Sequence, residues 1–99
     1  MAKHPDFLAH DDGDFVAVAV WDVQPGEALI GYLDGTDSIT LDVTEAVPLG
    51  HKVALADVAK DADVIEYGLR IGIATKDISR GDYVHTHNLR SARWQNSVA

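Results

Sequence analysis

The chain has no cysteine among its 99 residues, which excludes disulfides, thiolate metal sites and a cysteine nucleophile. Its hydrophobic runs are short, and none approaches the ~20 residues that a membrane-spanning helix needs. The opening residues, Met1-Ala2-Lys3-His4, include no long apolar stretch of the kind that a secretory signal carries. We therefore expect a protein of the cytoplasm that does not interact with membranes.

Positive charge is also scarce. There are 8 Lys and Arg residues against 16 Asp and Glu residues, which gives a net charge of −8. Proteins that bind nucleic acid need clustered Lys and Arg to replace the counterions of the phosphates, so this balance argues against such a partner. The 46% hydrophobic content and the short length predict a single folded domain over residues 1–99, with 1–6 and 95–99 as flexible ends.

Convincing helical periodicity is missing as well. Short runs rich in β-branched residues alternate instead with turns that contain Gly, Pro or Asp, which is typical of a domain built from strands. Any helical turn within 54–63 is expected to be short. The sequence therefore predicts a mostly β domain whose strands fall at 15–20, 28–33, 38–43, 51–58, 64–67, 71–75 and 83–89.

A weak repeat accompanies these turns. Residues 22–29 match 77–84, and 57–64 match more loosely. Each copy has Asp first, then an apolar residue, a turn residue at the fifth place and an apolar residue at the eighth. The middle copy carries Asp61 where the others have Gly, and Asp tolerates a left-handed backbone better than most residues. We interpret the repeat as structural, the alternative being three unrelated turns.

The stretch 83–89 holds the strongest candidate for chemistry. In an extended strand His85 and His87 would lie on one face, where two imidazoles can converge on one ion or one anionic ligand. A third imidazole, that of His51, would join them if residues 50–52 fold back beside this strand. The alternative is a half-exposed strand whose histidines only form hydrogen bonds.

Other polar and glycine positions are also candidates for a functional or structural role. His51 and Lys52 place a base or ligand beside a cation that suits a carboxylate or sulfonate, although the residues alone favour a solvated turn there. Asn88 joins the histidines only if the strand twists or ends there, and its alternative role is to cap a turn. Gly72, inside a predicted strand, suggests a bulge or a close approach of another backbone segment.

Several strings occurring in order give the chain a family resemblance. Together they resemble the altronate/galactarate dehydratase family, specifically its small N-terminal SAF-type domain, over roughly residues 7–94. Glu66 stands where single-chain members often have Lys, and Asp63 stands where Gly is usual. The strings are Pro48 to Leu55 (PLGHKVAL), Val64 to Gly68 (VIEYG), Ile71 to Thr75 (IGIAT), Asp77-Ile78 with Gly81, and Val84 to Leu89 (VHTHNL).

This resemblance implies a β-clip fold and a lyase context. Members remove water from a sugar acid to give a 2-keto-3-deoxy acid, often with ferrous iron, and single-chain members continue into a much larger domain. Free-standing small subunits occur in split altronate-type dehydratases and in sulfolactate sulfo-lyase, which expels sulfite. The resemblance therefore predicts the small subunit of a two-subunit sugar-acid dehydratase, inactive without a larger catalytic subunit that shares its active site.

The resemblance also assigns roles to residues. His51, His85 and His87 are the expected catalytic groups, and Lys52 and Asn88 the expected contacts to a small hydroxy-acid substrate. His85 and His87 are the expected ligands of Fe²⁺ or another divalent metal, unless the large subunit holds the ion.

Two alternative functions stay open. One is the small subunit of a sulfolactate sulfo-lyase, and the other is a non-catalytic SAF module that only binds. Self-association into a homo-oligomer is compatible with either. Trp94 beside Arg93 is a candidate interface anchor.

Overall fold

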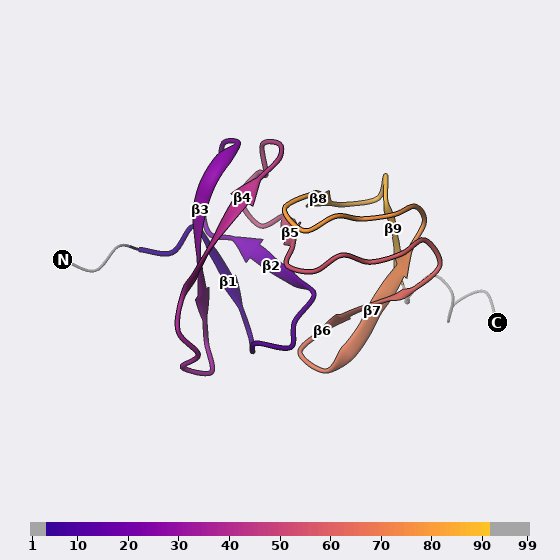
Figure 1. Ribbon diagram of the computed structural model, residues 1–99, viewed down its shortest axis with the longest axis horizontal. Helices are drawn as coiled ribbons and strands as arrows, with labels where there is room; N and C mark the ends of the chain where they lie inside the picture. The colour runs from indigo at the N-terminus through magenta and orange to yellow at the C-terminus, as the bar shows by residue number, and fades with distance from the viewer. Residues whose placement is uncertain (1–3, 92–99) are drawn as a thin grey trace.

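A computed structural model describes residues 4–91, and every described element is a strand (Figure 1). The prediction of a mostly β fold is confirmed. The candidate interface anchor Trp94 lies outside the described residues. The strands are β1 (Phe7–Ala9), β2 (Val16–Ala19), β3 (Gly26–Tyr32), β4 (Ile39–Val43), β5 (Lys52–Ala54), β6 (Asp63–Glu66), β7 (Leu69–Ala74), β8 (Tyr83–Val84) and β9 (Leu89–Ser91).

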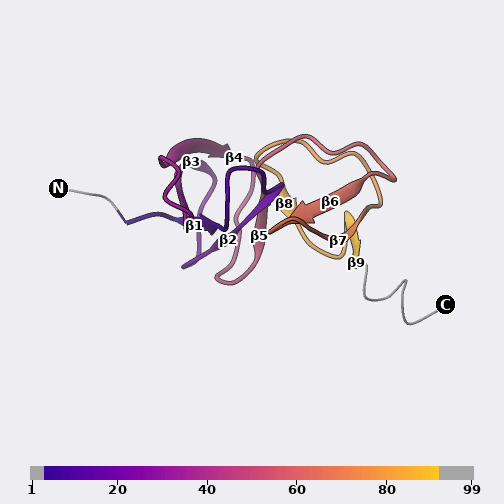
Figure 2. The same ribbon diagram turned by 90° about the horizontal axis from the view of Figure 1, so that it is seen from below.

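The strands form two sheets that lie end to end along the long axis of the molecule (Figures 1 and 2). The larger sheet has the order β4-β3-β1-β2-β5-β8, and the smaller has the order β6-β7-β9. Only β1 and β3 pair in parallel; the other pairs among these strands are antiparallel. Both sheets contain strands from distant parts of the chain, so their junction collects residues that are far apart in sequence.

Burial follows the sequence pattern closely. Successive residues of a strand face opposite sides, and on β2 the neighbours Val16 and Ala17 belong to two different hydrophobic clusters. This strand is therefore buried on both faces, as its continuous apolar run predicted. On β4, Leu41 and Val43 are buried while Thr40 is exposed, which is the alternation expected of a strand with one solvated face.

The repeat is structural. Its fifth residue has a positive φ in each predicted copy: 127° at Gly26, 74° at Asp61 and 95° at Gly81. The structure adds a fourth copy at residues 46–50, where Gly50 has a φ of 82°. The sequence pattern missed this copy because it begins with Ala instead of Asp.

The repeats join in pairs through their aspartates. Asp57 Oδ1 accepts a hydrogen bond of 2.8 Å from the backbone N–H of Arg80, and Asp77 Oδ1 accepts one of 2.9 Å from that of Lys60. In each copy, the aspartate accepts a hydrogen bond from the residue that stands three places after the aspartate of the other copy. The two turns are therefore joined by a reciprocal pair of hydrogen bonds, and the alternative of unrelated turns is wrong.

The other pair of repeats shows why its fourth copy lacks the aspartate. Asp22 Oδ1 accepts a hydrogen bond of 2.9 Å from the N–H of Leu49. In the reciprocal bond, the backbone N–H of residue 25 would donate to a carboxylate at position 46. Residue 25 is Pro25, which has no N–H to donate. A carboxylate at position 46 would therefore have no counterpart, and Ala46 stands there.

The prediction of one continuous strand over 83–89 is wrong. The chain turns at residues 85–88, between β8 and β9. The amide of Asn88 causes this break, because its Oδ1 accepts the N–H of His85 at 2.9 Å and its Nδ2 donates to the carbonyl of Tyr83 at 2.8 Å. Such side-chain bonds offer the backbone an alternative to a strand ladder. The predicted strand over 51–58 is likewise shortened to β5.

Candidate functional site

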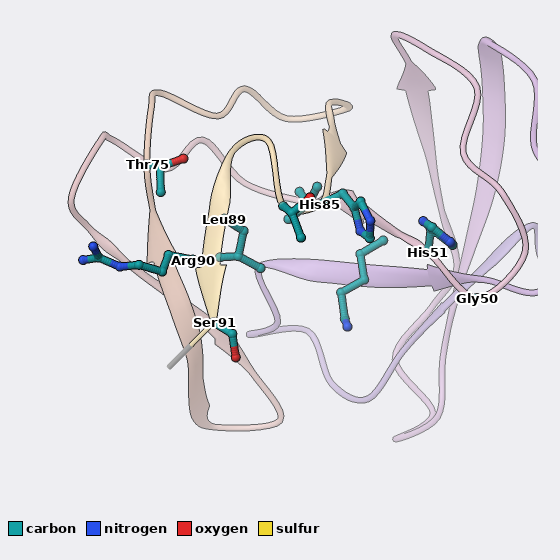
Figure 3. Close-up of a pocket in the computed structure, with 10 residues that line it drawn as sticks. Gly50, His51, Thr75, His85, Leu89, Arg90 and Ser91 are labelled. Carbon is teal, nitrogen blue, oxygen red and sulfur yellow. The ribbon is translucent and has the colours of Figure 1, made fainter. Parts of the chain in front are cut away.

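A cleft of about 700 Å³ opens where the two sheets meet (Figure 3). His51 and His85 lie on one side of it, and the residues of β9 lie on the other. The lining residues are Lys52 and Val84 from the larger sheet with Gly50 and His51 just before β5, His85 and Thr86 from the turn after β8, and Leu89, Arg90 and Ser91 from the smaller sheet with Thr75 just after β7.

Strand pairing brings the two histidine-bearing segments together. β5 and β8 pair antiparallel, with Lys52 opposite Val84. This register places residues 50–52 beside the turn that follows β8, and the ring centroids of His51 and His85 lie 4.8 Å apart. The expectation that residues 50–52 fold back beside the histidine stretch is confirmed.

The ring of Tyr83 lies near the imidazole rings of three histidines, His51, His85 and His87. Its ring centroid is 5.7 Å from those of His51 and His85 and 5.6 Å from that of His87. Its hydroxyl also forms a hydrogen bond of 2.5 Å with Nδ1 of His51. Sequence reasoning gave Tyr83 no role in the site. Its distance in sequence from His51 hid the contact.

The structure separates the five predicted site residues into three groups. His51, Lys52 and His85 line the cleft. His87 is exposed, with its ring near Tyr83, and does not line it. Asn88 is 4% exposed and its amide is engaged within the turn, which matches the alternative role of a cap.

The cleft carries positive charge in an acidic chain. Its lining includes Lys52 and Arg90 and no Asp or Glu, although the whole chain has a net charge of −8. The Arg90 side chain extends away from the imidazoles at the outer part of the lining (Figure 3). Such a lining attracts a small anion and offers it N–H donors.

Sequence reasoning gave Arg90 no role in the site. One signal could have found it, because Gly72 predicted a close approach of another backbone segment. A Cβ at Gly72 would lie 2.4 Å from the carbonyl oxygen of Arg90, so β9 can pair with β7 only because this residue is glycine.

The lining does not make a complete metal centre. Within residues 4–91, no three His, Asp or Glu side chains are grouped so as to bind an ion. His51 and His85 offer two imidazoles, and one nitrogen of His51 is engaged by Tyr83. Structural and catalytic zinc sites take three or four protein ligands, so this pair alone falls short of a donor set of that kind.

A small β domain whose sheets meet at a cationic, histidine-bearing cleft is suited to present polar groups to an anionic substrate. The chain belongs to the altronate/galactarate dehydratase SAF domain family, whose model matches residues 5–92. The resemblance found from the sequence strings is therefore confirmed.

Within residues 4–91, no helix is long and apolar enough to cross a membrane.

The relatives of the chain are lyases, dehydratases or their subunits. It is 40% identical to the (2R)-sulfolactate sulfo-lyase subunit alpha of Chromohalobacter salexigens, over 90% of this chain and 97% of that protein. It is 45% identical over 78 residues to the altronate dehydratase of Escherichia coli and 35% identical over 85 residues to that of Bacillus subtilis. The matched segment makes up only 15% and 16% of those two dehydratases.

Proposed function

We propose that this chain is the small subunit of a two-subunit lyase and contributes its cleft to an active site shared with a larger subunit. The observation that carries the proposal is the open cleft, in which imidazoles and cations gather without any carboxylate. The match to 97% of a protein named subunit alpha supports the division into subunits. A cleft on a domain with such a small core is better suited to a shared site than to a complete one.

The substrate we favour is (2R)-sulfolactate, because that name belongs to the relative matched over nearly its whole length. The molecule carries a carboxylate and a sulfonate, and Lys52 is placed to bind one of these groups. The second candidate is a sugar acid of the altronate or galactarate type, supported by 45% identity to the dehydratase of Escherichia coli.

Both substrates undergo the same elimination. A base removes the proton on the carbon next to the carboxylate, a carbon–carbon double bond forms, and the bond to the neighbouring leaving group breaks. In sulfolactate the carbon–sulfur bond breaks and sulfite leaves with the electron pair. In a sugar acid the hydroxyl takes a proton and leaves as water. The resulting enol rearranges to a 2-oxo acid in each case.

The cleft residues divide this work. Lys52 binds an anionic group of the substrate, and His51 and His85 are the imidazoles placed to exchange a proton or a hydrogen bond with it. We place His87 outside direct contact and assign Asn88 to the turn that positions His85. We place the divalent ion expected from the family mainly on the larger subunit, because residues 4–91 hold no complete donor set.

Affinity capture of the tagged chain from its own cells tests the proposal. We expect a larger protein in near-stoichiometric amount, and we expect the complex to release sulfite and a 2-oxo acid from (2R)-sulfolactate. Release of a 2-oxo acid from altronate or galactarate alone would select the dehydratase instead. Recovery of the chain without a partner or any lyase activity would leave a binding module and overturn the proposal.

A matched pair of variants connects the activity to the cleft. Lys52→Ala should raise KM about tenfold or more, because it removes a charge-assisted hydrogen bond to the substrate. Lys60→Ala is the control, since Lys60 is exposed and does not line the cleft. Equal effects of the two changes would place substrate binding outside this cleft.

A further inference from the structure

Tyr83 makes a specific contact with one nitrogen of a cleft imidazole. Its hydroxyl lies 2.5 Å from Nδ1 of His51, and both side chains are half-buried. Tyr83 is not among the residues that line the cleft, whereas His51 is. Nδ1 is therefore engaged on the protein side, and Nε2 is the nitrogen left for a bound ligand.

The direction of this hydrogen bond determines what Nε2 can do. A neutral imidazole carries one N–H and one acceptor nitrogen, and a phenol can either donate or accept. A phenol O–H is a stronger acid than a neutral imidazole N–H, and the imidazole lone pair is a stronger base than the phenol oxygen. The favoured arrangement has the phenol donating to Nδ1, and the ring proton then resides on Nε2.

We infer that Tyr83 is a positioning residue that holds neutral His51 in its Nε2–H tautomer, so that His51 donates a hydrogen bond to an anionic ligand in the cleft. The anionic nature of the ligand rests on the proposed function. His51 then binds the substrate and does not remove its proton. The proton acceptor must be sought in His85 or in the larger subunit.

The positions of the neighbouring rings support this division. His85 stacks on Tyr83 with an interplanar angle of 5°, and its ring centroid is 4.8 Å from that of His51. Within residues 4–91, the hydrogen bond between Tyr83 and His51 is the one that engages a ring nitrogen of these imidazoles. His51 is thus the fixed imidazole of the cleft, and His85 is the one whose nitrogens stay available to exchange a proton.

The tautomer can be read by NMR on the full chain labelled with ¹⁵N. Long-range proton–nitrogen correlation at about pH 8.5, where imidazoles are ordinarily neutral, distinguishes protonated from non-protonated ring nitrogens. We expect His51 to show a non-protonated Nδ1 and a protonated Nε2. A protonated Nδ1, or two nitrogens at averaged positions, would overturn the inference without any variant being made.

Tyr83→Phe adds a second test. The change removes the donor, so both tautomers of His51 become populated and the two nitrogen resonances move toward each other. Tyr67→Phe is the control, because the ring of Tyr67 lies against that of His10 in a tilted arrangement and not against His51. A Tyr83→Phe chain that keeps its backbone spectrum and its single His51 tautomer would refute the positioning role.

The complex with the larger subunit gives the corresponding kinetic result. We expect Tyr83→Phe to raise KM about fivefold, the effect of weakening one hydrogen bond to the ligand, while kcat stays near that of the unchanged enzyme. A fall in kcat with an unchanged KM would assign Tyr83 or His51 to proton transfer instead. Because the NMR result is independent of the partner, failure of the lyase proposal and failure of this inference remain distinguishable.

Discussion

Replacing Asn88 by Ala should destabilise the whole domain, even though Asn88 belongs to a turn at the surface. The substitution removes an acceptor from the N–H of His85 and a donor from the carbonyl of Tyr83. Asn88 is 4% exposed, so little water reaches the position that the amide vacates. Leaving a buried polar group unpaired costs about 1–3 kcal/mol. Two groups lose their partner and His85 is itself an exposed residue, so we expect a loss of about 2–4 kcal/mol, below the maximum for two fully buried groups.

Urea denaturation followed by far-UV circular dichroism measures this loss. A small domain has an unfolding free energy of about 5–15 kcal/mol, so the expected change shifts the midpoint clearly. Asn88→Asp should cost less than the alanine change, because a carboxylate can still accept from His85 but cannot donate to Tyr83. Thr86→Ala, in the same turn but exposed, should change stability by less than about 0.5 kcal/mol. If Asn88→Ala costs no more than Thr86→Ala, the amide does not hold the turn.

Three further changes test other parts of the fold. Gly72→Ala should cost more than about 2 kcal/mol, because its Cβ would lie 2.4 Å from the carbonyl oxygen of Arg90; an unchanged urea midpoint would contradict this packing. Asp61→Gly should stabilise by about 0.5 kcal/mol, since the φ of 74° is strained for an L-residue, and a lower midpoint would show that Asp61 is held by other interactions. The hydroxyl of Thr36, and then its backbone N–H, hold the pKa of the Asp34 carboxyl below its usual value. The ionised carboxylate therefore stabilises the folded state at pH values above the unfolded-state pKa of Asp34, and this stabilisation is lost as the pH falls through the lower folded-state pKa. NMR titration should show a higher Asp34 pKa in Thr36→Ala, and an unchanged pKa would rule out the hydroxyl as the main cause.

Much of the fold could be predicted because local burial patterns encode it. The continuous apolar run of β2 indicates a strand buried on both faces, and the alternation of β4 indicates a strand with one solvated face. Each pattern can be recognised within the strand itself. The positive φ at Asp61 was likewise predictable from its alignment with Gly26 and Gly81. These features depend on residues within a few positions of one another.

The final strand could not be predicted from the same pattern. Residues 83–89 alternate as a strand should, but the amide of Asn88 bonds to the backbone three and five residues earlier and closes a turn. Alternation indicates which side chains could share a face of a strand. It does not indicate whether side-chain hydrogen bonds to the backbone will close a turn in place of the strand. The predicted shared face of His85 and His87 failed for the same reason, although both rings still lie near Tyr83.

The candidate site was predicted in part. His51 and His85 were expected to meet, and they do, because pairing of β5 with β8 aligns their segments. Arg90 and the contact of Tyr83 with His51 were missed, since both depend on strand pairing between distant segments. Nothing in the local sequence of either residue specifies its partner.

The paired aspartates have a consequence for how this frame can change over evolution. Asp22, Asp57 and Asp77 fasten the turns through backbone N–H groups, and none of the three lines the cleft. A backbone N–H is present whatever side chain the residue bears, unless that residue is proline. Residues at the cleft can therefore be exchanged without loss of the hydrogen bonds that join the turns, which fits a family whose members are named both sulfo-lyases and dehydratases.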